Sequence, residues 1–241
     1  MVVRTDTPQV AVARRANLQA IMDDHRALCA TCVRQDTCAL RDLASTFNLA
    51  DAPGPLPEPA PWDADFPLQR DSSKCIKCMR CIQVCDKVQS LSVWDISGSG
   101  ARTTIDVSGN RVIKQADCSL CGQCITHCPT GALRERDDTQ KAYAALGDPD
   151  RVTIVQIAPA VRAAWGEAFG MPTGKATVGQ LVSVLRKLGA DYVFDTTFSA
   201  DLTIMEEGTE LLQRLQAGDL DNQPMFTSCC PGSVSYTHLT L

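Results

Sequence analysis

The chain has 241 residues, a hydrophobic content of 44% and an aromatic content of only 5%. This suits one or two ordinary domains or several small modules that a cofactor stabilises. The formal net charge of −5 and the lack of a basic cluster exclude nucleic acid as an expected partner. No stretch is long and apolar enough to span a membrane and no signal peptide is recognisable, so we expect a cytoplasmic protein.

The predicted elements begin with helices in residues 10–48, on either side of a turn that carries cysteines. Residues 51–65 are rich in proline and are expected to form an extended linker. Residues 66–145 contain an internal repeat, because CIKCMRCIQVC recurs as CSLCGQCITHC. Between the two copies, residues 91–113 alternate β-branched residues with glycine turns, which predicts short hairpin strands.

From residue 150 onwards the pattern changes to strands that alternate with helices. Strands are expected at residues 152–157, 192–194 and 225–228, the second of them buried, and helices at 160–169, 178–188 and 200–215. Strand–helix alternation with short connections predicts a parallel sheet. The last residues, 234–241 (VSYTHLTL), look like a translated sequencing adapter, so we leave them out of the fold and expect the natural sequence to continue past Gly232.

Thirteen cysteines are an odd number, which excludes a complete disulfide framework, and most of them lie in Cys-x-x-Cys runs that suit metal. Each copy of the repeat offers three closely spaced thiolates, and in paired bacterial-ferredoxin runs the fourth cysteine crosses to the other [4Fe–4S] cluster. This assigns one cluster to Cys75, Cys78, Cys81 and Cys128, and a second to Cys118, Cys121, Cys124 and Cys85. Gly122 and Gly131 are expected to let backbone N–H groups approach the sulfurs. Zinc is the alternative, but zinc sites use two pairs of cysteines rather than a repeated three-plus-one pattern that ends in Cys-Pro.

A further group of candidate ligands lies near the N-terminus: His25, Cys29, Cys32 and Cys38. On the residues alone it could be a surface histidine beside a zinc-like or free cysteine group. The spacing HxxxCxxCxxxxxC, however, resembles a segment of the large subunit of respiratory complex I and of modular iron-only hydrogenases. That resemblance implies a third [4Fe–4S] cluster with one histidine and three cysteine ligands. An imidazole in place of a thiolate removes negative charge and raises the reduction potential.

Three stretches of the C-terminal part resemble the catalytic domain of [FeFe]-hydrogenases. They are IAPAVR (157–162), DYVFDTTFSADLTIMEEGTELL (191–212) and PMFTSCCPG (224–232). With the cysteine runs upstream, the resemblance covers about residues 6–232. It implies a parent protein that catalyses 2 H⁺ + 2 e⁻ ⇌ H2. Electrons would pass from a ferredoxin, a flavoprotein or an NAD-linked subunit through the three clusters to an H-cluster, which is a [4Fe–4S] cluster joined to a di-iron subcluster.

The resemblance also implies roles for single residues. Cys230 matches a thiolate ligand of the H-cluster and Cys229 the cysteine that relays protons beside it. The residues that match the proton path are Glu207 and Glu210, with Arg214 near its outer end, and those that match the lining of the dithiolate bridge are Ala158 and Pro159. Heterolytic cleavage of H2 releases a proton that needs acceptors within hydrogen-bonding reach, which a thiol and two carboxylates on one helix face can provide. Without the resemblance, the same residues could be a solvated helix face, inert buried thiols and a strand-to-helix cap.

The chain departs from the family pattern in three places. Ser233 stands where the family usually has tryptophan, and the other three H-cluster cysteines are absent, so the chain by itself is not expected to turn over hydrogen. Such proteins often begin with a [2Fe–2S] domain, which is expected upstream of Met1. Two alternatives remain: a non-catalytic iron–sulfur subunit similar to those of complex I or NAD-linked dehydrogenases, and a hydrogenase-like sensor or cluster-assembly protein. TSCCPG with the ADLTIMEE helix argues against the first, and Cys229 against the second.

The expected fold is α+β with several modules. A cluster module with one histidine and three cysteine ligands occupies residues 1–50 and is joined by the linker to a ferredoxin-like 2[4Fe–4S] domain at 66–145. The start of an α/β hydrogenase catalytic domain with a parallel sheet follows at residues 150–233.

Overall fold

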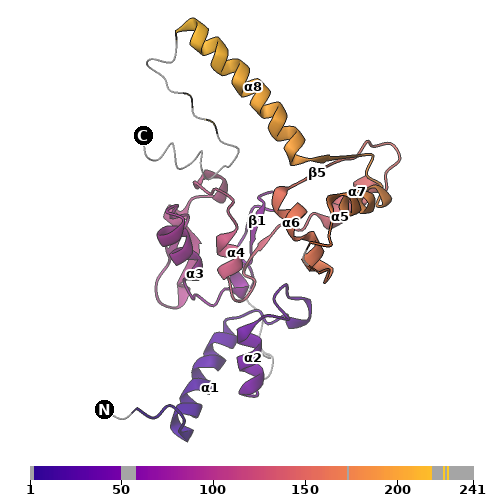
Figure 1. Ribbon diagram of the computed structural model, residues 1–241. Helices are drawn as coiled ribbons and strands as arrows, with labels where there is room; N and C mark the ends of the chain where they lie inside the picture. The colour runs from indigo at the N-terminus through magenta and orange to yellow at the C-terminus, as the bar shows by residue number, and fades with distance from the viewer. Residues whose placement is uncertain (1–2, 50–57, 173, 219–224, 226, 228–241) are drawn as a thin grey trace. The chain divides into compact units, whose positions relative to one another are not determined.

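The computed structural model describes residues 3–49, 58–172, 174–218, 225 and 227 (Figure 1). They form two compact units, the first ending at Arg136 and the second beginning at Asp137. Residues 137–145, which we expected in the ferredoxin-like domain, therefore belong with the second unit. A close approach explains this, because a Cβ atom on Gly189 would lie 2.6 Å from the carbonyl oxygen of Leu146. No helix in the described part of the chain is long and apolar enough to cross a membrane.

The first unit contains short helices and four short strands. They are α1 (Pro8–Asp23), α2 (Ala39–Thr46), β1 (Leu68–Arg70), α3 (Arg80–Gln83), β2 (Trp94–Ser97), β3 (Thr104–Val107), α4 (Gln123–His127) and β4 (Leu133–Glu135). The helices expected in residues 10–48 are confirmed. The side chain of Thr7 caps α1 by accepting a hydrogen bond from the Val10 amide at 3.3 Å, and Pro8 occupies the first turn.

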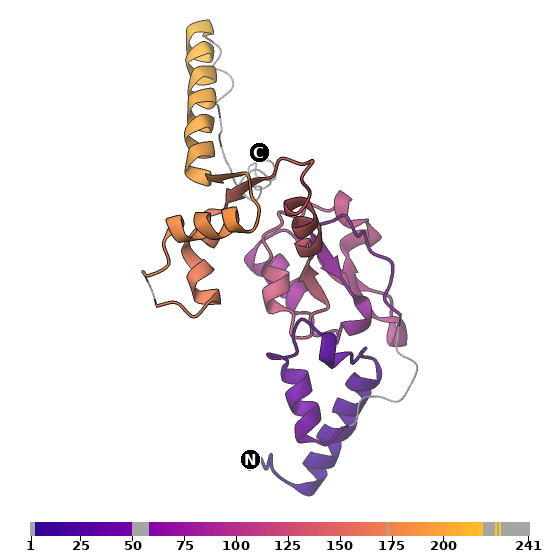
Figure 2. The same ribbon diagram turned by 90° about the vertical axis from the view of Figure 1, so that its right-hand side faces the viewer.

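Helices α1 and α2 pack against each other at the N-terminal end of the unit (Figure 2). Their contact buries a small cluster of side chains: Leu18, Met22, Cys38, Leu40 and Ala44. Ile76, from the first cysteine run, packs against the same cluster. Burial of apolar surface therefore joins the N-terminal helices to residues 66–136, the segment of the two cysteine runs.

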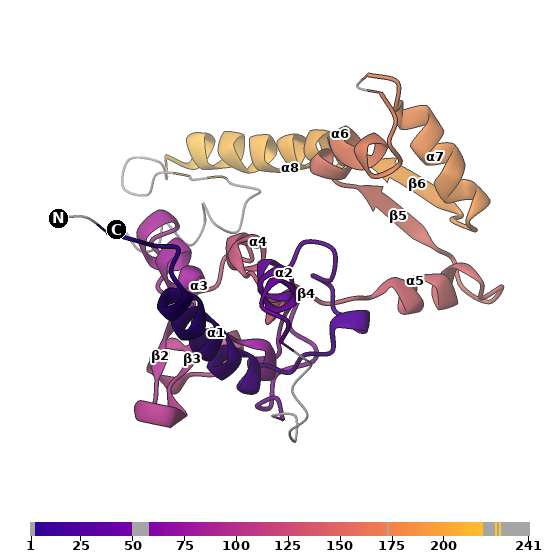
Figure 3. The ribbon, with the colours of Figure 1, turned by 90° about the horizontal axis from the view of Figure 1, so that it is seen from below.

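Two antiparallel strand pairs frame the segment of the two cysteine runs. The expected hairpin is confirmed as β2–β3 (Figure 3). Its register sets Trp94 opposite Val107. The second pair, β1–β4, brings the two ends of the segment together and sets Leu68 opposite Glu135 and Arg70 opposite Leu133. The buried core between the pairs centres on side chains that are nearly inaccessible to solvent: Val93, Trp94, Ile105, Val107 and Ile113.

The second unit has the expected α/β pattern. Its elements are α5 (Thr139–Leu146), β5 (Ile154–Ile157), α6 (Pro159–Ala168), α7 (Val178–Lys187), β6 (Tyr192–Asp195) and α8 (Thr196–Ala217). Strands β5 and β6 pair in parallel, which confirms the predicted orientation. Thr177 and Gln180 form a capping box that starts α7. Helix α8 begins directly at the end of β6 and extends away from β5 (Figure 1).

One expectation about this unit is wrong. The strand at residues 192–194 was expected to be buried, but Tyr192 is 55% exposed and Phe194 38% exposed. The reason is that β6 has one neighbouring strand among the described residues, so its faces have little cover there. The strand expected at 225–228 lies outside the described residues, apart from 225 and 227, which are not in a strand. Residues 51–57 of the linker and residues 234–241 also lie outside them.

Candidate metal centres

Three cavities of the first unit are each lined by one of the predicted sets of four donors. A cavity of about 200 Å³ is lined by Cys85, Cys118, Cys121 and Cys124. A second, of about 30 Å³, is lined by Cys75, Cys78, Cys81 and Cys128. A third, of about 10 Å³, is lined by His25, Cys29, Cys32 and Cys38. Cys85 thus lies beside the second cysteine run and Cys128 beside the first.

The described cysteines of these cavities are thiols rather than disulfides. Within the described ranges, no three His, Cys, Asp or Glu side chains are grouped as a single metal ion would require. A four-iron cube instead takes one ligand at each of four separate iron corners. The donor sets are therefore chemically suited to such a cube, since thiolate and imidazole are the ligands that iron–sulfur clusters use.

The two cysteine runs repeat each other in backbone conformation as well as in sequence. Lys77 and Leu120 occupy the same place in the two runs and both have a positive φ, 56°. Met79 and Gly122 also correspond, with φ values of 60° and 73°. A left-handed conformation costs a non-glycine residue roughly 1–2 kcal/mol, and strain of this kind collects at binding sites. Each run therefore turns around its cavity in the same strained way.

Backbone amides point at several of the sulfurs. The Val93 amide donates to the Cys85 sulfur at 3.4 Å. Val93 is the residue directly before β2. Closer to Gly122, where we expected such donors, the Leu120 amide hydrogen-bonds the Cys118 sulfur. Amide–sulfur hydrogen bonds stabilise negative charge on a ligated thiolate and tune the potential of the metal that it holds.

Burial makes these thiols weak acids. It raises the pKa of the Cys81 and Cys124 thiols to about 12, and it raises the pKa values of Cys75, Cys85 and Cys118 as well. Neighbouring thiols add to the effect, while hydrogen bonds from nearby amides and from the Trp94 side chain oppose it. Such thiols stay protonated at neutral pH unless a cation stabilises the thiolates, so metal uptake here must release protons.

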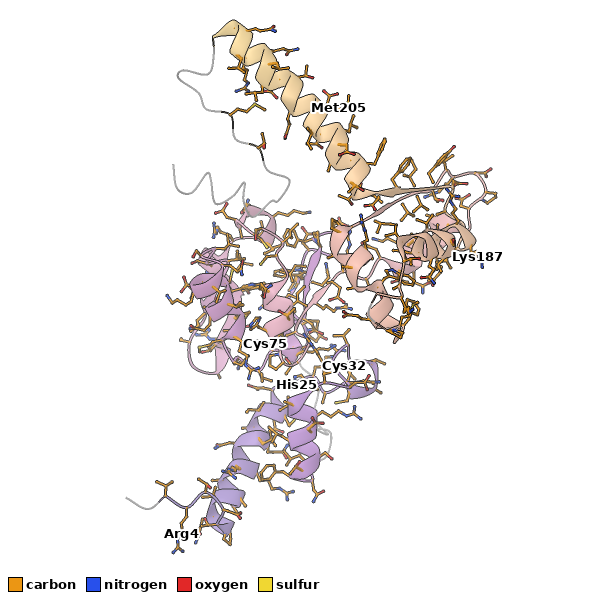
Figure 4. The ribbon with its side chains drawn as sticks, viewed as in Figure 1. Arg4, His25, Cys32, Cys75, Lys187 and Met205 are labelled. Atoms are coloured by element: carbon orange, nitrogen blue, oxygen red, sulfur yellow. The ribbon has the colours of Figure 1, made fainter. Side chains whose placement is uncertain are left out.

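His25 lies in a buried position, 7% exposed, just after α1 (Figure 4). Its Nδ1 atom lies 3.1 Å from the carbonyl oxygen of Lys74. Because a carbonyl can only accept, Nδ1 carries the proton and Nε2 keeps its lone pair. Burial lowers the pKa of His25 below its ordinary value of 6.5, and the hydrogen bond to Lys74 opposes this. The imidazole is therefore neutral near pH 7, the form that binds a metal.

The second and third cavities share a wall. Thr130, which is 1% exposed, lines both of them and donates its hydroxyl to the Lys74 carbonyl at 2.7 Å. That carbonyl thus accepts from Thr130 and from His25 together. Gly131 has a φ of 67°, and a Cβ atom there would lie 2.9 Å from Cγ2 of Val33. The close approach of Gly131 to Val33 was not predicted from the sequence. The only local signal for it is Thr130-Gly131, which follows directly after Cys128-Pro129.

In the second unit, the remaining predicted site residues that the structure describes lie at the start of α6 and on α8. Ala158 caps α6 and Pro159 begins it, at the end of β5. On α8, Glu210 accepts an ion-paired hydrogen bond from Arg214 at 2.6 Å. Glu207 lies roughly 16 Å along the helix from its start, at 1.5 Å per residue, so the described residues do not bring it to the β5 end. Cys229 and Cys230 lie outside the described residues.

Three parts of the chain match known families. Residues 151–240 match the family described as "Iron only hydrogenase large subunit, C-terminal domain". Residues 70–132 match a "4Fe-4S dicluster domain", and residues 14–53 match an "NADH-ubiquinone oxidoreductase-G iron-sulfur binding region".

The chain also resembles curated hydrogenases over most of its length. It is 43% identical to "NADP-reducing hydrogenase subunit HndD" of Solidesulfovibrio fructosivorans, over 98% of this chain and 41% of that protein. It is 35% identical to "Iron hydrogenase 1" of Clostridium pasteurianum, over 97% of this chain and 41% of that protein. It is 38% identical to "Periplasmic [Fe] hydrogenase large subunit" of Nitratidesulfovibrio vulgaris, over 52% of this chain and 37% of that protein. The chain spans about two fifths of the length of the first two relatives, and residues 151–240 carry its match to the iron-only hydrogenase family.

Proposed function

We propose that this chain is the part of an iron-only hydrogenase that carries electrons between a redox partner and the site of H2 chemistry. Three [4Fe–4S] clusters would do this. The observation that supports the proposal best is the set of three cavities, each lined by four donors of the type that such clusters use.

Each cavity would hold its cluster through residues of this chain. The ligand sets are Cys118, Cys121, Cys124 with Cys85; Cys75, Cys78, Cys81 with Cys128; and Cys29, Cys32, Cys38 with His25. The imidazole would bind through Nε2, because the Lys74 carbonyl engages Nδ1. When bound, a cluster supplies one-electron transfer. The chain supplies thiolates, amide donors to sulfur and apolar walls that limit water.

The parent protein would interconvert H2 with protons and electrons at an H-cluster. Cys230 would be one of its thiolate ligands, and Ala158 and Pro159 would line its dithiolate bridge. Cys229 would accept and release the proton next to the reacting site. From there the proton would pass to Glu207 and then to Glu210 on α8. Arg214, which pairs with Glu210, would lie near the outer end of this path and would not carry the proton itself.

The electron partner would be a ferredoxin or a flavoprotein or NAD-linked subunit. The name of the relative from Solidesulfovibrio fructosivorans, an NADP-reducing hydrogenase subunit, supports a nicotinamide-linked partner. An additional [2Fe–2S] cluster upstream would extend the chain of carriers toward such a partner. We place the protein in the cytoplasm, while one relative is named as periplasmic.

A second candidate is a non-catalytic electron-transfer subunit similar to those of complex I. The match of residues 14–53 to an iron–sulfur region of NADH-ubiquinone oxidoreductase favours it. The match of residues 151–240 to a hydrogenase domain favours the first candidate instead, because an electron-transfer subunit has no need of that domain. The uninterrupted reading frame of the parent separates the two. Further cysteine motifs able to complete an H-cluster support the hydrogenase, and their absence supports the subunit.

Iron analysis tests the cluster proposal on the chain itself. Anaerobic reconstitution should give about twelve irons per chain, four for each of three cubes, with a paramagnetic signal on reduction. Cys78→Ala, which removes an exposed ligand, should lower the content to about eight, while the neighbouring Met79→Ala should leave it at twelve. Four irons or fewer in the unaltered chain, or zinc in their place, would refute the proposal.

A further inference from the structure

Arg70 is a buried cation in the wall of one candidate cluster cavity. It is 8% exposed and lines the cavity of Cys75, Cys78, Cys81 and Cys128. Among the described residues that line this cavity, Arg70 is the only one with a formal charge at neutral pH. The cavity of Cys85, Cys118, Cys121 and Cys124 has Glu135 as the corresponding charged residue. The two cavities therefore differ in the sign of the charge beside them.

The strand register explains this difference. Gln69 lies opposite Arg134 at the centre of the β1–β4 pair. The local two-fold axis of an antiparallel pair at that point relates Arg70 to Glu135. Glu135 is exposed, so water and salt screen its charge, whereas the buried charge of Arg70 is screened much less. Arg70 therefore affects its cavity more strongly than Glu135 affects the other.

The guanidinium of Arg70 is fixed in place. Its Nη2 donates to the Ile105 carbonyl at 2.5 Å, and its Nη1 lies 3.4 Å from the Asp106 carboxylate. It also stacks over the ring of Trp62, 5.7 Å from the centroid. These contacts prevent the side chain from turning its charge out to water, as an unrestrained arginine would.

Asp106 only partly cancels this charge. Its side chain is 34% exposed, whereas that of Arg70 is 5% exposed. The carboxylate is thus the better screened partner of the pair, and the cavity keeps a net positive potential. Addition of one electron to a cluster in that cavity makes the site more negative by one charge. A fixed positive potential favours that addition, because the net charge around a cluster is one of the quantities that set its potential.

We propose that Arg70 raises the reduction potential of the cluster held by Cys75, Cys78, Cys81 and Cys128, and not that of the other ferredoxin-type cluster. This rests on the proposed function, because it requires a cluster in that cavity. Arg70 acts here as a positioning charge and is not a ligand.

A purely structural role is the competing explanation, since Arg70 also ties β1 to β3. The two explanations differ in sign. If Arg70 is only a tie, Arg70→Gln and Asp106→Asn both loosen the same contact and affect the cluster in the same direction. If the charge acts, removal of the cation lowers the potential and removal of its counter-charge raises it.

The test is a redox titration of the full, anaerobically reconstituted chain, with dithionite as the reductant and the paramagnetic signals as the readout. Arg70→Gln should lower one midpoint potential by at least 59 mV, which corresponds to a tenfold change in a one-electron equilibrium. Arg70→Lys, which keeps the charge, should shift it less than this, and Asp106→Asn should raise it. Arg134→Gln, an exposed arginine of the same strand pair, should move none of the potentials.

Two further measurements assign the effect. Cys78→Ala removes the cluster beside Arg70 and leaves the other two. In this background, Arg70→Gln should shift neither of the two remaining midpoint potentials, and a shift in either would overturn the proposal. Equal signs for Arg70→Gln and Asp106→Asn, or an unmoved potential in Arg70→Gln with full iron content, would also overturn it. If Arg70→Gln fails to fold, the sign of the Asp106→Asn shift decides. A wild-type chain without any cluster signal would instead refute the proposed function.

Discussion

Replacement of Gly131 by alanine tests how the histidine-bearing segment around Val33 is held against the segment of the two cysteine runs. Two costs add at this position. A positive φ costs an alanine roughly 1–2 kcal/mol, partly offset by about 0.4–1 kcal/mol because alanine restricts the unfolded chain. The new Cβ atom would also lie 2.9 Å from Cγ2 of Val33 and 3.2 Å from Cγ of Arg34, and overpacking of this kind costs about 1–3 kcal/mol.

Gly122 provides a matched control. It also has a positive φ, 73°, and lies in the same cysteine run, directly after Cys121, but a Cβ atom there would meet nothing within 4 Å. Gly122→Ala should therefore cost only the backbone term. We expect Gly131→Ala to destabilise the segment around Val33 by about 1–3 kcal/mol more than Gly122→Ala does.

Hydrogen exchange of the amides in residues 26–35 measures this difference locally. Every 1.4 kcal/mol is a factor of ten, so exchange should be roughly 5 to 150 times faster in Gly131→Ala than in the control. Val33→Ala, at a half-exposed position, removes the clashing methyl group and should restore most of the protection. Equal exchange in the two glycine variants, or no restoration by Val33→Ala, would refute the close packing of these segments.

Three further outcomes follow from single contacts. Thr130→Val removes the hydroxyl that donates to the Lys74 carbonyl, so hydrogen exchange should show the shared cavity wall to be about 1 kcal/mol less stable. Thr130→Ser keeps the hydroxyl and should show no such loss. An equal loss in both variants would contradict a role for the hydroxyl. Burial lowers the pKa of His25 below 6.5, so the folded state binds a proton here less readily than the unfolded chain does. The folded state therefore keeps its full stability above pH 6.5 and loses stability as the pH falls below that value. Urea unfolding of the metal-free chain at pH 7.5 and 5.5 should show this loss, and His25→Gln should reduce it; an unchanged pH dependence in the variant would assign it to other groups. Thr177→Ala breaks the capping box with Gln180 and should lower the free energy of opening α7, measured by hydrogen exchange, by about 1 kcal/mol. Thr177→Ser should keep most of that protection against exchange. No difference between the two variants would show that the cap is dispensable.

Much of the local structure could be predicted from the sequence, because its determinants are near one another in the chain. Pro8 after Thr7, and the Thr177–Gln180 capping box, mark the starts of two helices. Alternating β-branched residues indicate the β2–β3 hairpin, and strand–helix alternation indicates the parallel β5–β6 pair. The repeat of the cysteine runs also predicts the repeat of their backbone conformation.

The grouping of these cysteine and histidine residues around three cavities was predictable for a similar reason. Each group is built mostly from residues within about ten positions of one another, and the crossing of Cys85 and Cys128 follows from the pattern of paired runs. What the pattern could not predict is the exposure of β6. Burial depends on which segments cover a strand, and the strand's own residues do not specify them.

The sequence by itself therefore determined which histidine and cysteine residues group together and the type of cofactor that they suit, because short spacings carry that information. Only the tertiary structure decided how the segments meet: Thr130 between two cavities, Gly131 against Val33, and Arg70 buried beside one cysteine set. Most of these contacts join residues far apart in the chain, and Arg70 is placed by its contacts with the distant β3 strand. No local period or spacing encodes such contacts, since they arise when separate elements pack and bury their surfaces together.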